Sequence, residues 1–180
     1  MPTFKEMTDF FKEVGAVDVA HTKGSYLAHA IGVHNDLRDW GCDEDILRGG
    51  LFHSIYGTER FQRFTLPVER RDDVRELIGE RAEWLAWLNC FMDRQHFDEE
   101  IEKDAGPYKF RDRVSGDVHD TSDADFDALC TIHLCDWLEQ VPRSQDWDYR
   151  RRAYRRMAER LGGIALESYD RVYTNEAAPT

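Results

Sequence analysis

The sequence predicts an all-α protein, folded as a single domain of about seven or eight helices over residues 1–180. Three observations lead to this prediction. Apolar residues recur with the helical period of about 3.6 through most of the chain. Residue types that cap helices lie at the ends of these periodic segments. The alternating pattern of a strand is confined to about residues 104–118, where a short hairpin or loop insertion is expected.

The first part of the chain predicts three helices. Thr3 and Glu6 form a capping box at the start of the first helix. After a loop over residues 17–24, a second helix is predicted for residues 25–40 and a third for 43–56. Each starts on a capping residue and stops at a glycine, so the two are expected to pack as neighbours across a tight turn.

The later helices are expected to complete the core. The stretch 82–92 is apolar almost all round and is predicted to be buried. An Asp-rich stretch, 120–127, opens a long helix that ends near Pro142. Further helices are predicted over about residues 68–78, 149–161 and 164–173, and residues 176–180 are expected to form a frayed tail.

Composition and charge narrow the classes of partner. The formal net charge of −12 argues against a nucleic-acid or membrane-surface protein. There is no apolar run of about 18 residues and no signal-peptide pattern, and a cytoplasmic location is expected. The four cysteines form no Cys-x-x-Cys pair and are predicted to be reduced thiols. Whether the chain forms a homodimer is left open.

Three polar residues lie in apolar helical segments. Leu27-Ala28 precedes His29, Leu51-Phe52 precedes His53, and Asp136 lies among apolar residues of the long late helix. Burying such groups is costly unless they are paired or bind a cation. Helical bundles build metal sites in their cores from histidines and carboxylates of separate helices. The three residues therefore predict a site for a divalent ion such as Mn²⁺, Fe²⁺, Zn²⁺ or Mg²⁺. The alternative is a metal-free, hydrogen-bonded network.

The order of these residues resembles the HD superfamily of metal-dependent phosphohydrolases over about residues 20–141. That family places a histidine on an early helix, a His-Asp pair at the end of the next and an aspartate on a later helix. His29, His53 and Asp136 match the first histidine, the second histidine and the last aspartate. The string Leu-Phe-His-Ser-Ile-Tyr-Gly-Thr is more similar still to an uncharacterised HD-like group with Ser after this histidine. The resemblance implies an HD-like helical bundle, a divalent ion and phosphohydrolase activity.

Ser54 departs from the family pattern. It stands where the family has a metal-binding aspartate, and a neutral hydroxyl is a poor ligand for a divalent ion. A lower metal affinity is therefore expected, and a two-metal centre is not. The alarmone hydrolases of this superfamily also carry an acidic pair just beyond the His-Asp, where this chain has Gly57-Thr58 and then Glu59. What remains is a His-His-Asp set like that of mononuclear sites with open positions.

Four further residues are candidates for catalysis or for substrate binding. Glu59 or His21 is expected to accept a proton in catalysis. Lys23 and Arg60 are expected to bind phosphate groups. A further metal ligand is left open among His21, His34 and His133.

Three functions are compatible with these residues. The favoured one is a metal-dependent hydrolase that acts on a small phosphorylated or nucleotide-like metabolite. The second is a catalytically silent HD-fold protein that binds or senses a ligand. The third is an iron-dependent HD-fold oxygenase, which the absence of a bridging aspartate at position 54 disfavours.

Overall fold

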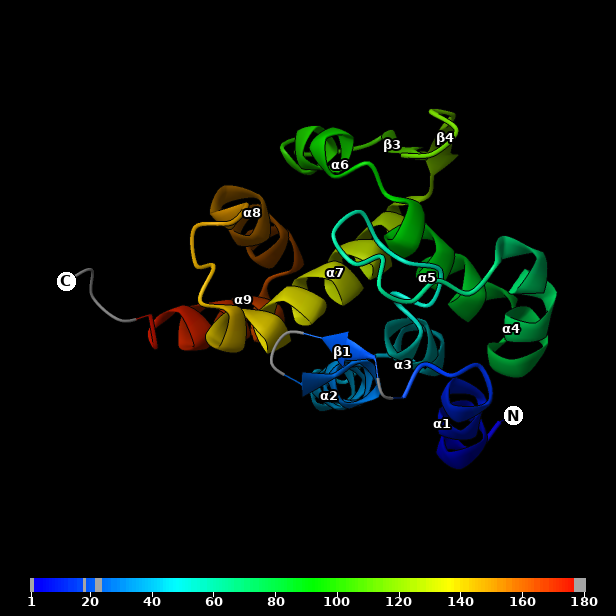
Figure 1. Ribbon diagram of the computed structural model, residues 1–180. Coiled ribbons are helices and arrows are strands. Elements are labelled where there is room, and N and C mark those ends of the chain that lie inside the picture. The colour runs from blue at the N-terminus through cyan, green and yellow to red at the C-terminus, as the bar shows by residue number, and fades with distance from the viewer. Residues whose placement is uncertain (1, 18, 22–23, 177–180) are drawn as a thin grey trace.

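The computed structural model describes residues 2–17, 19–21 and 24–176, and of His21 only the backbone. It confirms the all-α class: within these ranges the chain forms nine α-helices, one short 3-10 helix and two small hairpins (Figure 1). The helices are α1 (Phe4–Glu13), α2 (Tyr26–Asp39), α3 (Glu44–Leu51), η1 (Val68–Arg70), α4 (Arg71–Ile78), α5 (Glu80–Phe91), α6 (Arg94–Ile101), α7 (Asp123–Ser144), α8 (Arg151–Leu161) and α9 (Gly163–Tyr173). The antiparallel hairpins pair β1 (Ala20–His21) with β2 (Gly24–Ser25) and β3 (Tyr108–Arg111) with β4 (Val118–Thr121).

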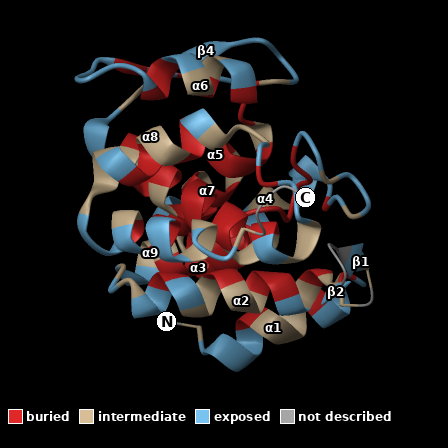
Figure 2. Ribbon diagram, turned by 90° about the vertical axis from the view of Figure 1, so that its left-hand side faces the viewer, coloured by how far each residue is buried: buried red, intermediate tan, exposed pale blue. Residues whose placement is uncertain are grey.

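Helix α7 lies at the centre of the bundle. All residues from Ile132 to Leu138 are buried, so every side of these turns is covered by protein (Figure 2). The covering helices are α2, α3, α5, α8 and α9. A polar side chain in this part of α7 must therefore find its partners inside the protein.

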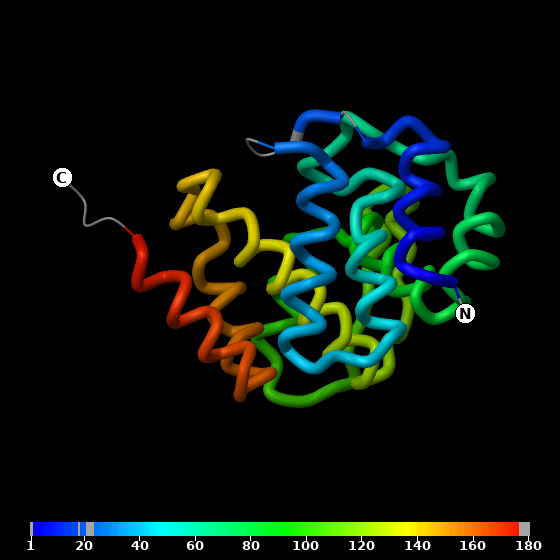
Figure 3. The backbone as a smooth tube through the Cα atoms, turned by 90° about the horizontal axis from the view of Figure 1, so that it is seen from below, coloured from blue at the N-terminus to red at the C-terminus, as the bar shows by residue number. Residues whose placement is uncertain are grey.

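Helices α2 and α3 pack side by side, as the capping pattern predicts. Ser25 and Asp43 cap them by accepting hydrogen bonds from the backbone N–H groups of Ala28 and Ile46. Gly41, with φ 78°, takes the left-handed conformation that reverses the chain between them. Seen from below, the two helices lie between α1 on one side and α8 and α9 on the other (Figure 3).

Helix α3 ends at Leu51, five residues before the predicted end at 56. Phe52, with φ −101° and ψ 9°, leaves the helical conformation, and tight turns follow. In the first of these, the backbone N–H of His53 donates to the carbonyl of Gly50 at 3.3 Å. His53 and Ser54 therefore lie on a turn just beyond the helix, and both side chains are buried.

Two elements, α6 and the β1–β2 hairpin, were not predicted from the sequence. Helix α6, capped by the side chain of Asp93, buries only Phe97 and Ile101 as apolar residues, which is too few for a clear period. The β1–β2 hairpin lies within the predicted loop 17–24 and its edge. The β3–β4 hairpin is the expected one, although it extends to Thr121.

The connection between α7 and α8 has an unusual backbone. Gln145 has φ 65° and Arg150 has φ 45°, a left-handed conformation that is uncommon for residues other than glycine. They stand at the two ends of the segment 145–150, where α7 stops and α8 starts. This segment contributes to the cavity described below.

None of the helices formed by the described residues combines the length and the apolar character that crossing a bilayer requires.

Candidate metal centre and its cavity

The fold brings together the three polar residues singled out in the sequence. His29 comes from the first turn of α2, His53 from the turn after α3, and Asp136 from the middle of α7. Their exposed fractions are 2%, 1% and 6%. The Asp136 Oδ1 atom lies 3.0 Å from His29 Nε2 and 3.5 Å from His53 Nε2, and the two Nε2 atoms are 3.2 Å apart. One ligand atom from each residue lies within 4.8 Å of the others, a spacing at which one ion could contact all three.

Hydrogen bonds on the far side of each imidazole fix its orientation. The Nδ1 atom of His29 contacts the carboxylate of Glu139, one turn after Asp136 on α7. The Nδ1 atom of His53 lies 2.7 Å from the carbonyl oxygen of Gly50 and donates to it. With Nδ1 as the donor, each Nε2 is directed toward Asp136, which is how metal-binding histidines are usually held. Donor type, burial and orientation thus fit a divalent ion with open positions.

The charges of the metal-free site are tightly coupled. Burial lowers the pKa of His29, but its hydrogen bonds to Asp136 and Glu139 outweigh this and raise the pKa to about 9. Burial lowers the pKa of His53. Burial opposes ionisation of Asp136, yet the two histidines hold its pKa well below the usual range. The metal-free site therefore holds a proton on His29 near neutral pH, which a bound metal ion would displace.

Ser54 supplies no charge to this site. Its side chain is 2% exposed, beside His53 on the same turn, and its hydroxyl faces that of the buried Tyr26. Burial raises the pKa of Tyr26, which keeps its hydroxyl neutral. The described residues therefore provide one ionised ligand, Asp136, where the HD pattern would provide two.

A second layer of residues holds the His53 turn in place. The carbonyl oxygen of His53 accepts hydrogen bonds from the Asn89 side chain at 2.8 Å and from the Cys90 thiol at 3.2 Å. Asn89 in turn accepts a hydrogen bond at 3.0 Å from the Nδ1 atom of His133. The His133 Nε2 atom accepts one at 2.8 Å from the guanidinium of Arg150. His133 is thus occupied at both nitrogens, outside the cluster of possible ligands.

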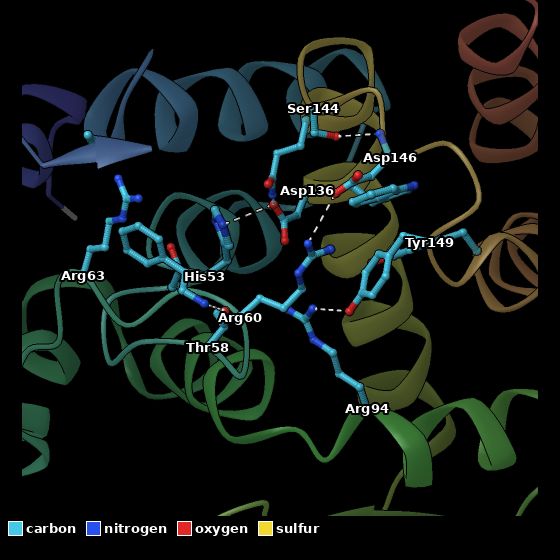
Figure 4. A pocket seen from close by; sticks show the side chains of 15 residues that line it. His53, Thr58, Arg60, Arg63, Arg94, Asp136, Ser144, Asp146 and Tyr149 are labelled. Atoms are coloured by element: carbon cyan, nitrogen blue, oxygen red, sulfur yellow. Dashed lines mark hydrogen bonds and ion pairs between the residues drawn. The ribbon is translucent and has the colours of Figure 1, made fainter. Parts of the chain in front are cut away.

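Two residues of the His29–His53–Asp136 triad, His53 and Asp136, line a cavity of about 400 Å³, a size typical of small-molecule sites. His53, Ser54 and Asp136 line one part of it, and the segment after α3 and the α7–α8 connection line another (Figure 4). The remaining lining residues include three arginines, one aspartate and several side chains with hydroxyl or amide groups. They are Thr58, Arg60, Arg63, Arg94, Gln140, Ser144, Asp146, Tyr149 and Tyr154.

The other residues predicted from the sequence differ in whether they line the cavity. Arg60 lines the cavity, and its role in binding substrate stays a prediction. Glu59 does not line it: it is exposed, and its carboxylate accepts a hydrogen bond at 3.1 Å from the backbone N–H of Arg94. His34 packs against the ring of Phe4, with centroids 4.8 Å apart, rather than joining the triad. Lys23 and the side chain of His21 lie outside the described residues, so their roles stay predictions.

Four residues of the site or its cavity were not predicted from the sequence. Glu139 and Gln140 are three and four positions after Asp136, so helical spacing alone places them on its face. Arg94 and Tyr149 lie far from the motif in sequence, and only the fold brings them to the cavity.

Comparison with solved structures identifies the architecture. A metazoan orthologue of SpoT, which hydrolyses ppGpp and plays a role in starvation responses, matches with a TM-score of 0.56 over 97% of this chain and 96% of that one. The fold is HD-like. The sequence identity is 16%, so the likeness concerns the fold.

Sequence comparisons add a regional match. Residues 10–94 match a family described as a domain of unknown function (DUF6817). The matched region includes His29, His53 and Ser54 but stops before Asp136. Comparison with curated proteins gives no match.

Proposed function

We propose that this protein is a metal-dependent phosphohydrolase of a small phosphorylated or nucleotide-like metabolite. The observation that carries the proposal is the convergence of His29, His53 and Asp136 at the edge of a cavity that three arginines also line. The HD-like fold supports it, because the matching solved structure is that of a protein that hydrolyses ppGpp.

His29, His53 and Asp136 would hold the ion, with Glu139 and the Gly50 carbonyl orienting the two imidazoles. A bound divalent ion would supply a Lewis acid for a phosphoryl oxygen and lower the pKa of a bound water. On an ion such as Zn²⁺ this water would be partly ionised near neutral pH, so the reaction would need no separate carboxylate base. This agrees with the position of Glu59 outside the cavity.

The charge of the cavity favours an anionic substrate. Arg60, Arg63 and Arg94 line the cavity together with Asp136 and Asp146, in a protein with a formal net charge of −12. A concentration of guanidinium groups in an acidic protein is expected where the ligand is an anion. Gln140, Ser144 and Thr58 add neutral groups that can hydrogen-bond a sugar or phosphate.

The test is phosphate release from a panel of nucleotides and sugar phosphates, with Mn²⁺, Fe²⁺, Zn²⁺ or Mg²⁺ or with EDTA. We expect release that needs metal and falls at least about a hundredfold in His53→Ala. His119→Ala, a histidine on the exposed strand β4, is the matched control and should keep full activity. Activity that persists in EDTA, or equal loss in both variants, would contradict the proposal.

Ser54 favours a second candidate, a catalytically silent protein that keeps the cavity and binds a phosphorylated ligand. The loss of one carboxylate weakens metal binding more than it weakens anion binding by the arginines. This candidate predicts that a phosphorylated ligand binds the protein and is recovered unchanged, whether metal is present or not.

A further inference from the structure

Arg94 is a buried cation, and its contacts with the described residues neutralise little of its charge. Its exposed fraction is 9%, and its Nη1 atom donates to the hydroxyl of Tyr149 at 2.7 Å. Among the described residues no carboxylate pairs with its guanidinium. A guanidinium carries five N–H donors, and an arginine this buried normally has an anionic partner.

The neighbouring Arg150 shows how this protein satisfies a buried arginine that has a structural role. Its side chain is 10% exposed, and its guanidinium donates to both carboxylate oxygens of Asp98 and to His133. Arg94 lies close enough to contact the same aromatic residue, Tyr149, yet has no such carboxylate. The difference is that Arg94 lines the cavity and Arg150 does not.

Tyr149 joins Arg94 to a second cation. The guanidinium of Arg60 lies over its ring, 4.1 Å from the centroid, while its hydroxyl accepts the hydrogen bond from Arg94. Both arginines are directed toward Tyr149 and into the same part of the cavity (Figure 4). The carboxylate that faces this pair is that of Asp146, 3.3 Å from Arg60. Among the side chains that line this end of the cavity, Arg60 and Arg94 are cations and Asp146 is an anion.

The backbone holds Tyr149 and Asp146 in place. The segment that carries them is bounded by the left-handed residues Gln145 and Arg150. Such conformations persist in proteins only where surrounding contacts fix them. Here Asp98 and His133 fix Arg150, the residue after Tyr149. The positions of the tyrosine and the aspartate are therefore set before any ligand arrives.

We propose that Arg94, Arg60 and Tyr149 form an anion-binding subsite, apart from the metal triad, that takes a phosphate group remote from the reacting bond. Arg94 offers charged N–H donors and Tyr149 fixes their direction, while Arg60 closes the subsite from the side of the α3–η1 segment. The substrate is then a small molecule with two separate phosphate groups, one at each end of the cavity. Only this last point rests on the proposed function, because the subsite would bind an anion without any reaction.

Asp146 gives the subsite an internal competitor. Its carboxylate pairs with Arg60 at the position that a ligand oxygen would approach. An incoming phosphate must therefore displace this carboxylate or tolerate its charge. Both residues of the pair are about half exposed, so the pair itself is weak, and a doubly charged phosphate should win.

The test is calorimetric titration of inorganic phosphate into the metal-free protein in EDTA, where the metal cannot contribute. We expect Arg94→Gln to weaken phosphate binding about tenfold or more, the equivalent of one charge-assisted hydrogen-bonded contact. Tyr149→Phe should weaken it less. Asp146→Asn should strengthen it about two- to fivefold by removing the competitor. Arg152→Gln, a similar change on the exposed face of α8, should leave it unchanged.

Other outcomes of these experiments distinguish failure of the subsite proposal from failure of the proposed hydrolase function. Binding that survives Arg94→Gln but is lost in His53→Ala would place the phosphate at the triad and overturn the inference. So would a lack of phosphate binding by the wild-type protein. If Arg94→Gln fails to fold, Arg94→Lys replaces it in the test. This variant keeps the charge and should retain part of the phosphate binding. Phosphate binding without metal-dependent hydrolysis would leave the subsite standing while the proposed function fails.

Discussion

Ser54 determines how strongly the candidate centre can hold a metal. With two neutral imidazoles and one carboxylate, the site has one formal negative charge to offer a divalent ion. A second carboxylate would bring the count to two and match the charge of the ion. The residue at position 54 therefore controls affinity more directly than the geometry, which already suits an ion.

Ser54→Asp is predicted to strengthen binding of Mn²⁺ by about tenfold or more, because it adds a charged ligand beside His53. Equilibrium dialysis of the purified variant measures this directly. Ser54→Asn, of similar size but neutral, is the control and should show no gain. Equal affinity in wild type and Ser54→Asp would mean that this side chain does not face the ion.

Glu139 is predicted to act on the metal through His29. Its carboxylate holds the Nδ1 side of the imidazole and itself pairs with Arg143. Glu139→Gln keeps the shape but removes the charge, and we expect metal affinity to fall about ten- to a hundredfold, as for other residues that orient metal ligands. Measured by the same dialysis, Glu167→Gln on α9 should have no effect. An unchanged affinity in Glu139→Gln would remove this residue from the site.

At this scale the sequence predicted the triad but not its supports. His29, His53 and Asp136 stand out because each is polar within an apolar helical segment. Glu139 does not, since a charged residue near the end of a helix is ordinarily solvated. The role of Arg94 was not predicted either, because a single sequence does not distinguish a buried arginine from an exposed one.

Among the elements, helix α5 supports the site without entering it. Asn89 bridges His53 and His133, and both partners are buried. Asn89→Ala is predicted to destabilise the fold by about 1–3 kcal/mol, the cost of leaving buried polar groups without partners. Urea unfolding measures this, with the exposed Gln95→Ala of α6 as control. The same variant should lower metal affinity, since it frees the His53 turn.

His133 on α7 is predicted to stay neutral in mildly acidic solution. Burial, with the positive charges of Arg150 and Arg94, lowers its pKa well below 6.5. Below about pH 6.5 the unfolded chain binds a proton that the folded protein does not, so this residue's contribution to stability falls as the pH drops.

The measurement for His133 is nitrogen NMR of its imidazole at pH 5.5. We expect the neutral form with the proton on Nδ1, which the hydrogen bonds to Asn89 and from Arg150 require. A doubly protonated ring at that pH would show that the buried network is not formed.

The sequence predicted the elements well where apolar periodicity is strong and poorly where it is weak. Helices α2, α5 and α7 are rich in apolar residues, and α2 and α7 also have capping residues. Helix α6 has few apolar residues, and no helix was predicted for it. The third helix was predicted too long because Leu51, Phe52 and Ile55 keep a helical spacing even though the backbone has already turned. Apolar residues in a tight turn and in a helix give the same pattern over a few positions.

For the whole molecule, metal binding should appear as stability. A ligand at about one hundred times its Kd stabilises a folded protein by about 2.7 kcal/mol. For a chain of 180 residues this corresponds to a rise in Tm of about 5–10 °C. Thermal unfolding with and without Mn²⁺ checks this. His53→Ala should lose the shift, whereas His119→Ala should keep it.

The all-α architecture was predictable because helical periodicity extends over most of the chain, and the HD-like fold because three residues on separate helices kept their order. The cavity was not predictable. Its arginines come from the segment after α3 and the start of α6, and its tyrosine from the α7–α8 connection. Their meeting depends on tertiary packing, which leaves no local signal.

Helix α7 also sets a length. Asp136, Gln140 and Ser144 follow one another at four-residue intervals along one side of the cavity. At about 1.5 Å per residue, the row is about 12 Å long. Because α7 packs against α2, α3, α5, α8 and α9, the spacing of this row is fixed and acts as a ruler. A ligand that contacts both Asp136 and Ser144 must therefore span about 12 Å.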